Sequence, residues 1–96
     1  MLFVATCVDK PHSLDKRKEN RPAHLAYLNG LGARVKLGGA LLGPDHQTPM
    51  GSMIIFEGES ERDILDLLAK DPYSAAGLFE NVSVRPWRPA VGQTLT

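Results

Sequence analysis

The chain has 96 residues, of which 43% are hydrophobic, and its 11 lysines and arginines balance its 11 aspartates and glutamates. This length allows one domain, and the hydrophobic content is that of a globular protein and not of a disordered one. A neutral chain lacks the excess of basic residues that binding to phosphates needs, so we expect no nucleic-acid partner.

The first predicted element is a strand over residues 2–8, an apolar stretch rich in β-branched and aromatic side chains that ends before Pro11. The stretch is too short to span a membrane and lacks the charged start and cleavage site of a signal peptide. We therefore expect no membrane partner and a cytoplasmic location. The single cysteine, Cys7, lies within this strand and is expected to be a buried apolar side chain, not a nucleophile.

A helical pattern follows the first strand. One stripe at helical spacing is formed by Leu25, Leu28 and Leu31 together with His24. The sequence allows two starting points for this helix, because Ser13 could cap it but Pro22 lacks the amide hydrogen that a continuous helix uses. We expect either a kink at Pro22 or a separate helix start near Asn20.

The remaining elements follow from apolar runs separated by glycine, proline and acidic residues. They are strands over residues 35–42 and 51–57, a helix that begins at a capping sequence in residues 60–63 and is broken at residues 71–73, a short helical turn over 74–78, and a strand over 79–85. The order β-α-β-β-α-β is that of the ferredoxin-like α+β fold, a four-stranded antiparallel sheet with both helices on one face.

The third predicted strand carries apolar side chains on both of its faces. Met53 and Ile55 point to one face, whereas Ile54 and Phe56 point to the other. Two helices cover only one face of a four-stranded sheet. We therefore infer a homodimer in which a second copy covers the other face.

The three histidines are candidate functional residues, but they lie far apart in the sequence and have no partners at metal-ligand spacing. We therefore expect no metal site and no cofactor. His12 and His46 lie in predicted loops and are expected to be exposed. His24 lies on an apolar stripe instead, where a buried imidazole needs hydrogen bonds for its nitrogens.

Asp71 is the candidate partner of His24, because it ends a helix that is expected to pack beside the helix carrying His24. A carboxylate that accepts a hydrogen bond from one ring nitrogen would fix the tautomer and leave the other nitrogen as a base in the cleft. Two alternatives remain open at this point. His24 could be a purely structural histidine, and Asp71 could serve only to cap backbone amides.

Charged residues are unevenly distributed along the chain. Acidic residues dominate residues 57–71, whereas residues 9–36 contain Lys10, Lys16, Arg17, Lys18, Arg21, Arg34 and Lys36. One interpretation is a pair of solvated helices of opposite charge that lie side by side. The other is that some of the basic residues attract an anionic ligand.

Several short motifs resemble those of the YciI-like (YCII-related) family. They are Arg21-x-x-His24-Leu25-x-Tyr27-Leu28, Gly38-Gly39-x-Leu41-x-Gly43-Pro44, Gly51-Ser52, Asp71-Pro72-Tyr73-x-x-Ala76-Gly77-Leu78-Phe79 and Pro86-Trp87. Their order spans nearly the whole chain. The resemblance implies a single domain of this family over residues 1–96, with the fold of the dimeric α+β barrels and an active-site His–Asp pair that maps onto His24 and Asp71.

The residues and the resemblance together favour a cofactor-independent lyase, isomerase or dehydrochlorinase that acts on a small cyclic, anionic metabolite. The residues expected to bind such a substrate are Arg21, Gly38, Gly39 and Ser52. Arg21, one turn before His24, could hold a carboxylate or phenolate, the glycines leave space beside the helix, and Ser52 offers a hydroxyl. Alternatives are a surface salt bridge at Arg21 and a strand bulge at the glycines. The alternative function is a non-catalytic module that binds a small ligand or another protein.

Overall fold

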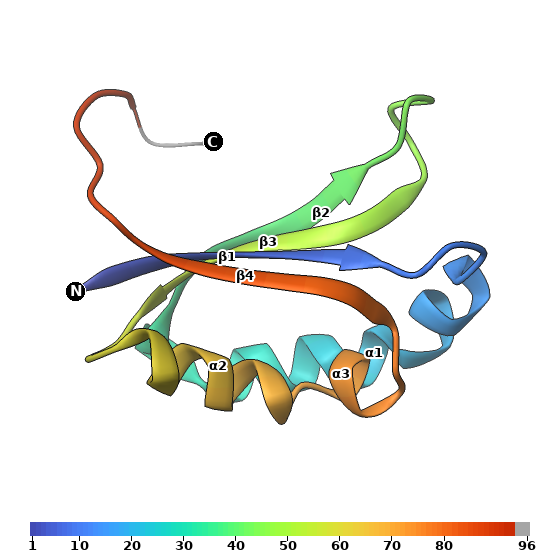
Figure 1. Ribbon diagram of the computed structural model, residues 1–96, viewed down its shortest axis with the longest axis horizontal. Helices are drawn as coiled ribbons and strands as arrows, with labels where there is room; N and C mark the ends of the chain where they lie inside the picture. Colours follow the sequence, from blue (N-terminus) through green and yellow to red (C-terminus); the bar gives the residue numbers. More distant parts are fainter. Residues whose placement is uncertain (94–96) are drawn as a thin grey trace.

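The computed structural model describes residues 1–93, in which four strands form one antiparallel sheet and the helices cover one of its faces (Figure 1). In chain order the elements are β1 (Leu2–Asp9), α1 (Leu14–Gly30), a 3₁₀ turn (Gly32–Arg34), β2 (Val35–Leu42), β3 (Pro49–Glu57), α2 (Glu61–Ala69), α3 (Pro72–Ala75) and β4 (Phe79–Trp87). The strand order β2-β3-β1-β4 confirms the predicted ferredoxin-like α+β fold.

The hydrophobic core lies between the helices and the sheet face that they cover. It consists of Phe3, Ala5 and Cys7 from β1, Ile54 and Phe56 from β3, and Ile64 and Leu68 from α2. These strand residues are spaced two apart, because alternate side chains of a strand point to the same face. The buried position of Cys7 agrees with the expectation from the sequence.

Helix α1 runs without interruption from Leu14 to Gly30, so of the two alternatives that the sequence left open, the separate start near Asn20 is wrong. Pro22 removes one hydrogen bond, to the carbonyl of Lys18, but both residues are exposed and water can bond to that carbonyl. The apolar stripe is also narrower than predicted, because Leu25 is 39% exposed. No helix within residues 1–93 is long and apolar enough to cross a membrane.

The start of α2 agrees with the predicted capping sequence, since the Ser60 hydroxyl accepts the backbone N–H of Asp63 at 3.2 Å. The end of α2 differs from the prediction. The helix stops at Ala69, and Asp71 caps the next helix, α3, where its carboxylate accepts the backbone N–H of Tyr73 at 2.9 Å. Asp71 is therefore fixed at the beginning of α3 and does not end α2.

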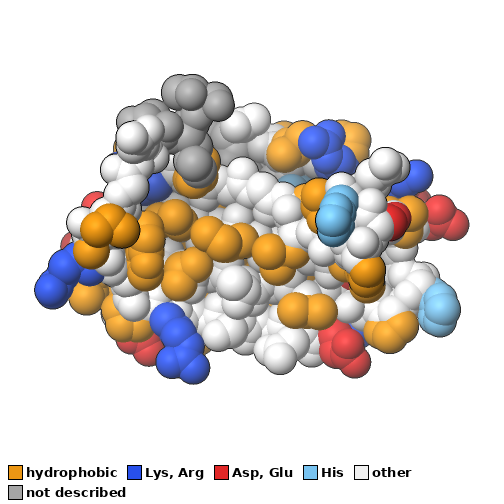
Figure 2. Space-filling view, turned by 90° about the horizontal axis from the view of Figure 1, so that it is seen from above, with side chains coloured by type: hydrophobic (Ala, Val, Ile, Leu, Met, Phe, Trp, Pro, Cys, Tyr) orange, Lys and Arg blue, Asp and Glu red, His pale blue; other side chains and the backbone are white. Residues whose placement is uncertain are grey.

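The second face of the sheet is not covered by a helix within residues 1–93 (Figure 1). Apolar side chains gather across it (Figure 2), among them Val8, Leu37 and Met53, which are 38–45% exposed. Ile55 points to the same face, because it pairs with Val4 and Leu37 in the neighbouring strands. Strand β3 thus has apolar side chains on both faces, as predicted, and the helices of residues 1–93 cover only one of them.

Candidate active site

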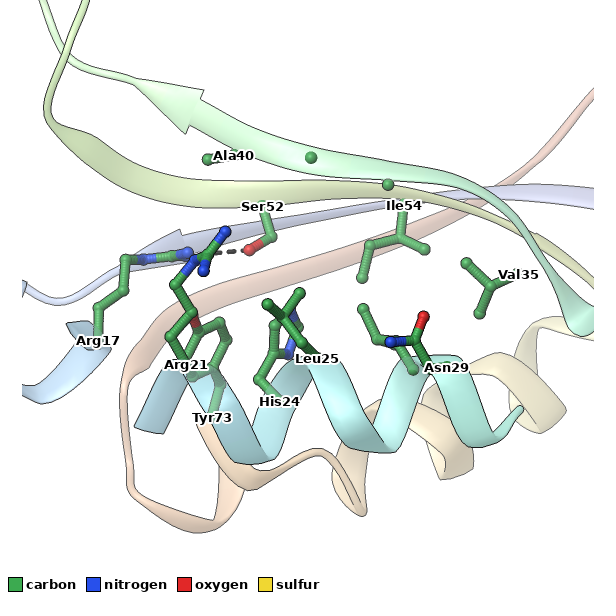
Figure 3. A pocket seen from close by; sticks show the side chains of 13 residues that line it. Arg17, Arg21, His24, Leu25, Asn29, Val35, Ala40, Ser52, Ile54 and Tyr73 are labelled. Atoms are coloured by element: carbon green, nitrogen blue, oxygen red, sulfur yellow. Dashed lines mark hydrogen bonds between the residues drawn. The ribbon is translucent and has the colours of Figure 1, made fainter. Parts of the chain in front are cut away.

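A cleft of about 290 Å³ lies between α1 and the helix-facing side of β2 and β3 (Figure 3). Its polar lining residues are Arg17, Arg21, His24, Asn29, Ser52 and Tyr73. Its apolar lining consists of Leu25, Leu28, Val35, Ile54 and the segment from Gly38 to Ala40. Figure 3 shows both arginines and Ser52 at one end, with Val35 and Ile54 toward the other. The cleft therefore has a cationic end and a mainly apolar end, at which Figure 3 also shows Asn29.

His24 and Asp71 form a hydrogen-bonded pair beside this cleft. Nδ1 of His24 lies 2.7 Å from Oδ2 and 2.9 Å from Oδ1 of Asp71, and the two side chains are 8% and 1% exposed. An ionised carboxylate can only accept hydrogen bonds, so Nδ1 carries the hydrogen, and in the neutral form of the imidazole Nε2 presents its lone pair. The expected proximity of the two residues is confirmed, whereas their catalytic role remains a prediction.

Tyr73 fixes the plane of the His24 imidazole. The two rings are stacked with their centroids 3.9 Å apart and an angle of 16° between their planes. Tyr73 is itself 1% exposed and packs against Phe79 in a T-shaped arrangement, with the ring centroids 5.9 Å apart. Burial raises the pKa of Tyr73 above its ordinary value, although the charges of Arg17 and Arg21 act in the opposite direction. The phenol therefore stays neutral at neutral pH.

Arg17 is a site residue that the sequence reasoning missed. Its Nε and Nη2 lie 2.6 and 3.0 Å from the Asp9 carboxylate, Nη2 also donates to the Ser52 hydroxyl at 3.0 Å, and its guanidinium lies 4.7 Å from the Tyr73 ring centroid. Burial acts to lower the pKa of Arg17, but the hydrogen bonds to Asp9 hold it above its ordinary value. The missed signal is spacing, because Arg17 precedes His24 by seven positions, two turns on one helix face.

The four residues that we expected to bind substrate all line the cleft, but they do so in different ways. Ser52 is 3% exposed in the cleft wall, and Arg21, which forms no ion pair within residues 1–93, extends into the cleft (Figure 3). Gly38 pairs with Ile54, so its position lies on the sheet face toward the cleft. Gly39 pairs with Met53 on the opposite face, so a side chain at this position would point away from the cleft. The register shifts of β2 lie elsewhere, so the glycines are not a bulge.

The other two histidines and Cys7 take no part in this site. His12 and His46 are exposed, as expected, in loops where each has a positive φ. Burial, followed by the charge of Asp71, raises the pKa of the Cys7 thiol to about 12. Residues 1–93 contain no group of three His, Cys, Asp or Glu side chains arranged to hold a metal ion.

The topology and the cleft define a class of protein: a ferredoxin-like α+β fold with a buried His–Asp pair beside a cationic cleft. Comparison with known families agrees with this assignment, since the model of the YCII-related domain matches residues 1–88. The chain belongs to the YCII-related family. The family membership that the sequence motifs predicted is therefore confirmed.

Two relatives cover almost the whole chain. Protein YciI of Escherichia coli is 40% identical over 95 residues, which are 92% of this chain and 97% of YciI. The structure of 5-chloro-2-hydroxyhydroquinone dehydrochlorinase (TftG) from Burkholderia phenoliruptrix, in complex with 2,5-dihydroxybenzoquinone, is 37% identical with a TM-score of 0.84. That match covers 94% of this chain and 96% of the other.

A more distant structure, from Bacteroides thetaiotaomicron, has a TM-score of 0.60 at 12% identity, with 100% of this chain and 95% of the other covered. At that identity the likeness concerns the fold alone. The structural neighbours are dimeric α+β barrel proteins, which agrees with the predicted fold class.

Proposed function

We propose that this protein is an enzyme that acts without a cofactor on a small cyclic, anionic metabolite, as a lyase, isomerase or dehydrochlorinase. His24 is the general acid or base, and Asp71 orients it. The observation that supports this most is the 2.7 Å contact between Nδ1 and a buried carboxylate. It leaves Nε2 of a residue that lines the cleft to exchange a proton with a bound molecule.

The reaction class is supported by the relative whose name describes a dehydrochlorinase. Dehydrochlorination removes one proton and one chloride from the substrate, so it needs a base but no external oxidant. A neutral imidazole oriented by a carboxylate can accept such a proton near neutral pH. The hydroxylated rings in the description of that structure also support a cyclic substrate for this chain.

The functional unit in this proposal is a homodimer. Its interface is the uncovered sheet face, whose exposed apolar side chains include Leu37 and Met53. The cytoplasmic location remains a prediction from the sequence.

The experiment measures turnover of 5-chloro-2-hydroxyhydroquinone first and then of a panel of small phenols, hydroxyquinones and lactones. Chloride release and mass spectrometry follow elimination and isomerisation. Three variants are compared with the parent: His24→Ala, Asp71→Asn and, as the matched control, His12→Ala in an exposed loop. We expect His24→Ala to reduce turnover by about 10²–10⁴-fold, roughly 3–5 kcal/mol of transition-state stabilisation.

Asp71→Asn is expected to reduce turnover by no more than His24→Ala, because it removes the orienting charge and keeps the proton carrier. His12→Ala should match the parent. A folded His24→Ala variant, checked by circular dichroism and by its mass in solution, that turned over a substrate at the parental rate would contradict the enzyme assignment. The cleft would then belong to a ligand-binding module.

A further inference from the structure

The cationic end of the cleft contains more hydrogen-bond donors than the protein itself uses. Arg17 is 5% exposed, and its hydrogen bonds to Asp9 and Ser52 use Nε and Nη2. None of them uses Nη1, which carries two further N–H groups. A guanidinium that is almost fully buried thus lines the cleft with donors left over.

Two neighbouring hydroxyl groups, those of Ser52 and Tyr73, can also bond to a molecule in the cleft. Ser52, which is 3% exposed, accepts the hydrogen bond from Arg17, so its own hydrogen is left to donate. The hydroxyl of Tyr73 belongs to a side chain that lines the same cleft, beside the Arg17 guanidinium, which lies 4.7 Å from the Tyr73 ring centroid. No buried side-chain nitrogen or oxygen of residues 1–93 lacks a hydrogen-bond partner, so the donors left over at this end are ones that water in the cleft, or a ligand that replaces the water, can reach.

Only one of the two guanidinium groups at this end of the cleft is paired with a carboxylate. Arg17 is paired with Asp9, but Arg21 extends toward the same place and forms no ion pair in the described part of the chain (Figure 3). The other nearby carboxylate, Asp71, is 0% exposed and is held by His24 and by the Tyr73 amide. Within residues 1–93 Arg21 is therefore the guanidinium at the cleft that no carboxylate pairs with.

We propose that Arg17, Ser52 and Tyr73 form a preformed seat for an anionic oxygen of the ligand, and that the side chain of Arg21 completes it. The ligand class is a monocyclic carboxylate or a ring oxyanion, bound with its charge toward Arg17. The ring then lies along Gly38, where no side chain protrudes, beside Ile54 and toward the apolar end. This inference rests on the proposed function, since it assigns the orientation of the substrate in the same cleft.

The orientation has a chemical consequence. The charged oxygen is bound at the arginine end, and His24 lies farther along α1 than Arg17 and Arg21. Nε2 therefore meets a ring position next to the charged group and not that group itself. Asp9 is a positioning residue in this arrangement, because it fixes the guanidinium through two of its nitrogens before a ligand arrives.

The test compares two probes of the same shape, benzoate and its neutral isostere benzamide, by NMR titration of the labelled protein at pH 7. We expect benzoate to bind the parent at least about tenfold more tightly than benzamide. The variants Ser52→Ala and Arg17→Lys should each weaken benzoate binding by about tenfold or more, because each removes a hydrogen bond to a charged group. They should change benzamide binding much less. Arg62→Lys, at an exposed site on α2, is the matched control.

Two results with the parent protein would overturn the seat: equal binding of benzoate and benzamide, or no binding of either probe. A preference for benzoate that survives both variants and disappears only in Arg21→Ala would also overturn it. If Arg17→Lys does not fold, Ser52→Ala alone decides. The binding test of the seat is independent of the catalytic assignment, because benzoate and benzamide are bound and not turned over. A His24→Ala variant that keeps full turnover removes the enzyme assignment while the preference for benzoate still tests the seat.

Discussion

Arg17 and Asp9 form a buried two-point ion pair, with Nε 2.6 Å from Oδ2 and Nη2 3.0 Å from Oδ1, and both side chains are 6% exposed. The pair joins the end of β1 to the second turn of α1. Its planar geometry matches the guanidinium to the carboxylate, which is the arrangement that makes such contacts strong. It also means that neither residue can be removed alone without leaving a buried charge.

The first prediction concerns this pair. Arg17→Met should lower the free energy of unfolding by about 3–5 kcal/mol, because Asp9 is left buried and unpaired. The double variant with Asp9→Asn should recover part of the loss, since the buried charge is gone. Urea unfolding followed by circular dichroism measures both. The control is Arg62→Met, whose side chain is 83% exposed and which should change stability by less than about 1 kcal/mol. Equal effects of the two arginine variants would contradict the prediction.

The second prediction concerns the two structural tasks of Asp71. Asp71→Ala removes the cap of α3 and the acceptor of the His24 Nδ1–H, so it should lower the free energy of unfolding by about 2–4 kcal/mol. Asp71→Asn should lower it by less, because an asparagine can cap a helix and offers an oxygen to the ring. Chemical denaturation of both variants at pH 7 checks this order. An alanine variant as stable as the asparagine variant would show that the cap and the ring contact contribute little.

The third prediction tests the interface on the uncovered sheet face. The parent should be a dimer at micromolar concentration by light scattering, and Met53→Asp should shift it to the monomer, because a carboxylate would be buried between two apolar surfaces. Leu65→Asp is the matched control. Leu65 is 42% exposed and Met53 is 38% exposed, but Leu65 lies on α2. A parent that is monomeric, or a Met53→Asp variant that remains dimeric, would exclude this face as the interface.

The fourth prediction follows from the raised pKa of Cys7. At pH 8 iodoacetamide should modify the folded protein far more slowly than the urea-unfolded chain, because the reagent needs an exposed thiolate. Equal labelling rates in the two states would contradict the buried, protonated thiol. Mass spectrometry gives both rates.

The same thiol makes stability depend on alkaline pH. Between pH 9 and about 12 the unfolded chain loses the thiol proton while the folded protein keeps it. The unfolded state then binds fewer protons, so the free energy of unfolding falls as the pH rises through this window. A Cys7→Ala variant should lack this contribution, and comparison of the two proteins near pH 10 would reveal the difference.

The sequence was sufficient for the topology and for the His–Asp pair. Strand periodicity, the capping sequence before α2 and the breaks between elements are local signals, and they placed the strands to within about two residues. His24 and Asp71 were brought together by one further step, the packing of neighbouring helices in the expected fold. The resemblance of the motifs led to the same pair.

The cationic end of the cleft could not be predicted in the same way. Asp9, Arg17, Ser52 and Tyr73 come from four different elements, and their meeting depends on the register between β1 and β3 and on how α1 lies across them. Arg17 was counted in the sequence only as one basic residue among seven. The continuity of α1 through Pro22 was missed for a related reason, because exposure of the freed carbonyl is a tertiary property.

The position of β1 in the sheet has a consequence for how this chain folds. The first strand in the sequence is a central one, and its two neighbours come much later, since Val8 pairs with Gly51 and Leu2 pairs with both Glu57 and Trp87. Only β2 and β3 are paired through a short connection. Most of the sheet therefore requires the closure of long loops before its contacts form, which slows folding. Until β3 and β4 have docked, β1 is an apolar segment with two unpaired edges, and this is the stage at which the chain is most exposed to aggregation.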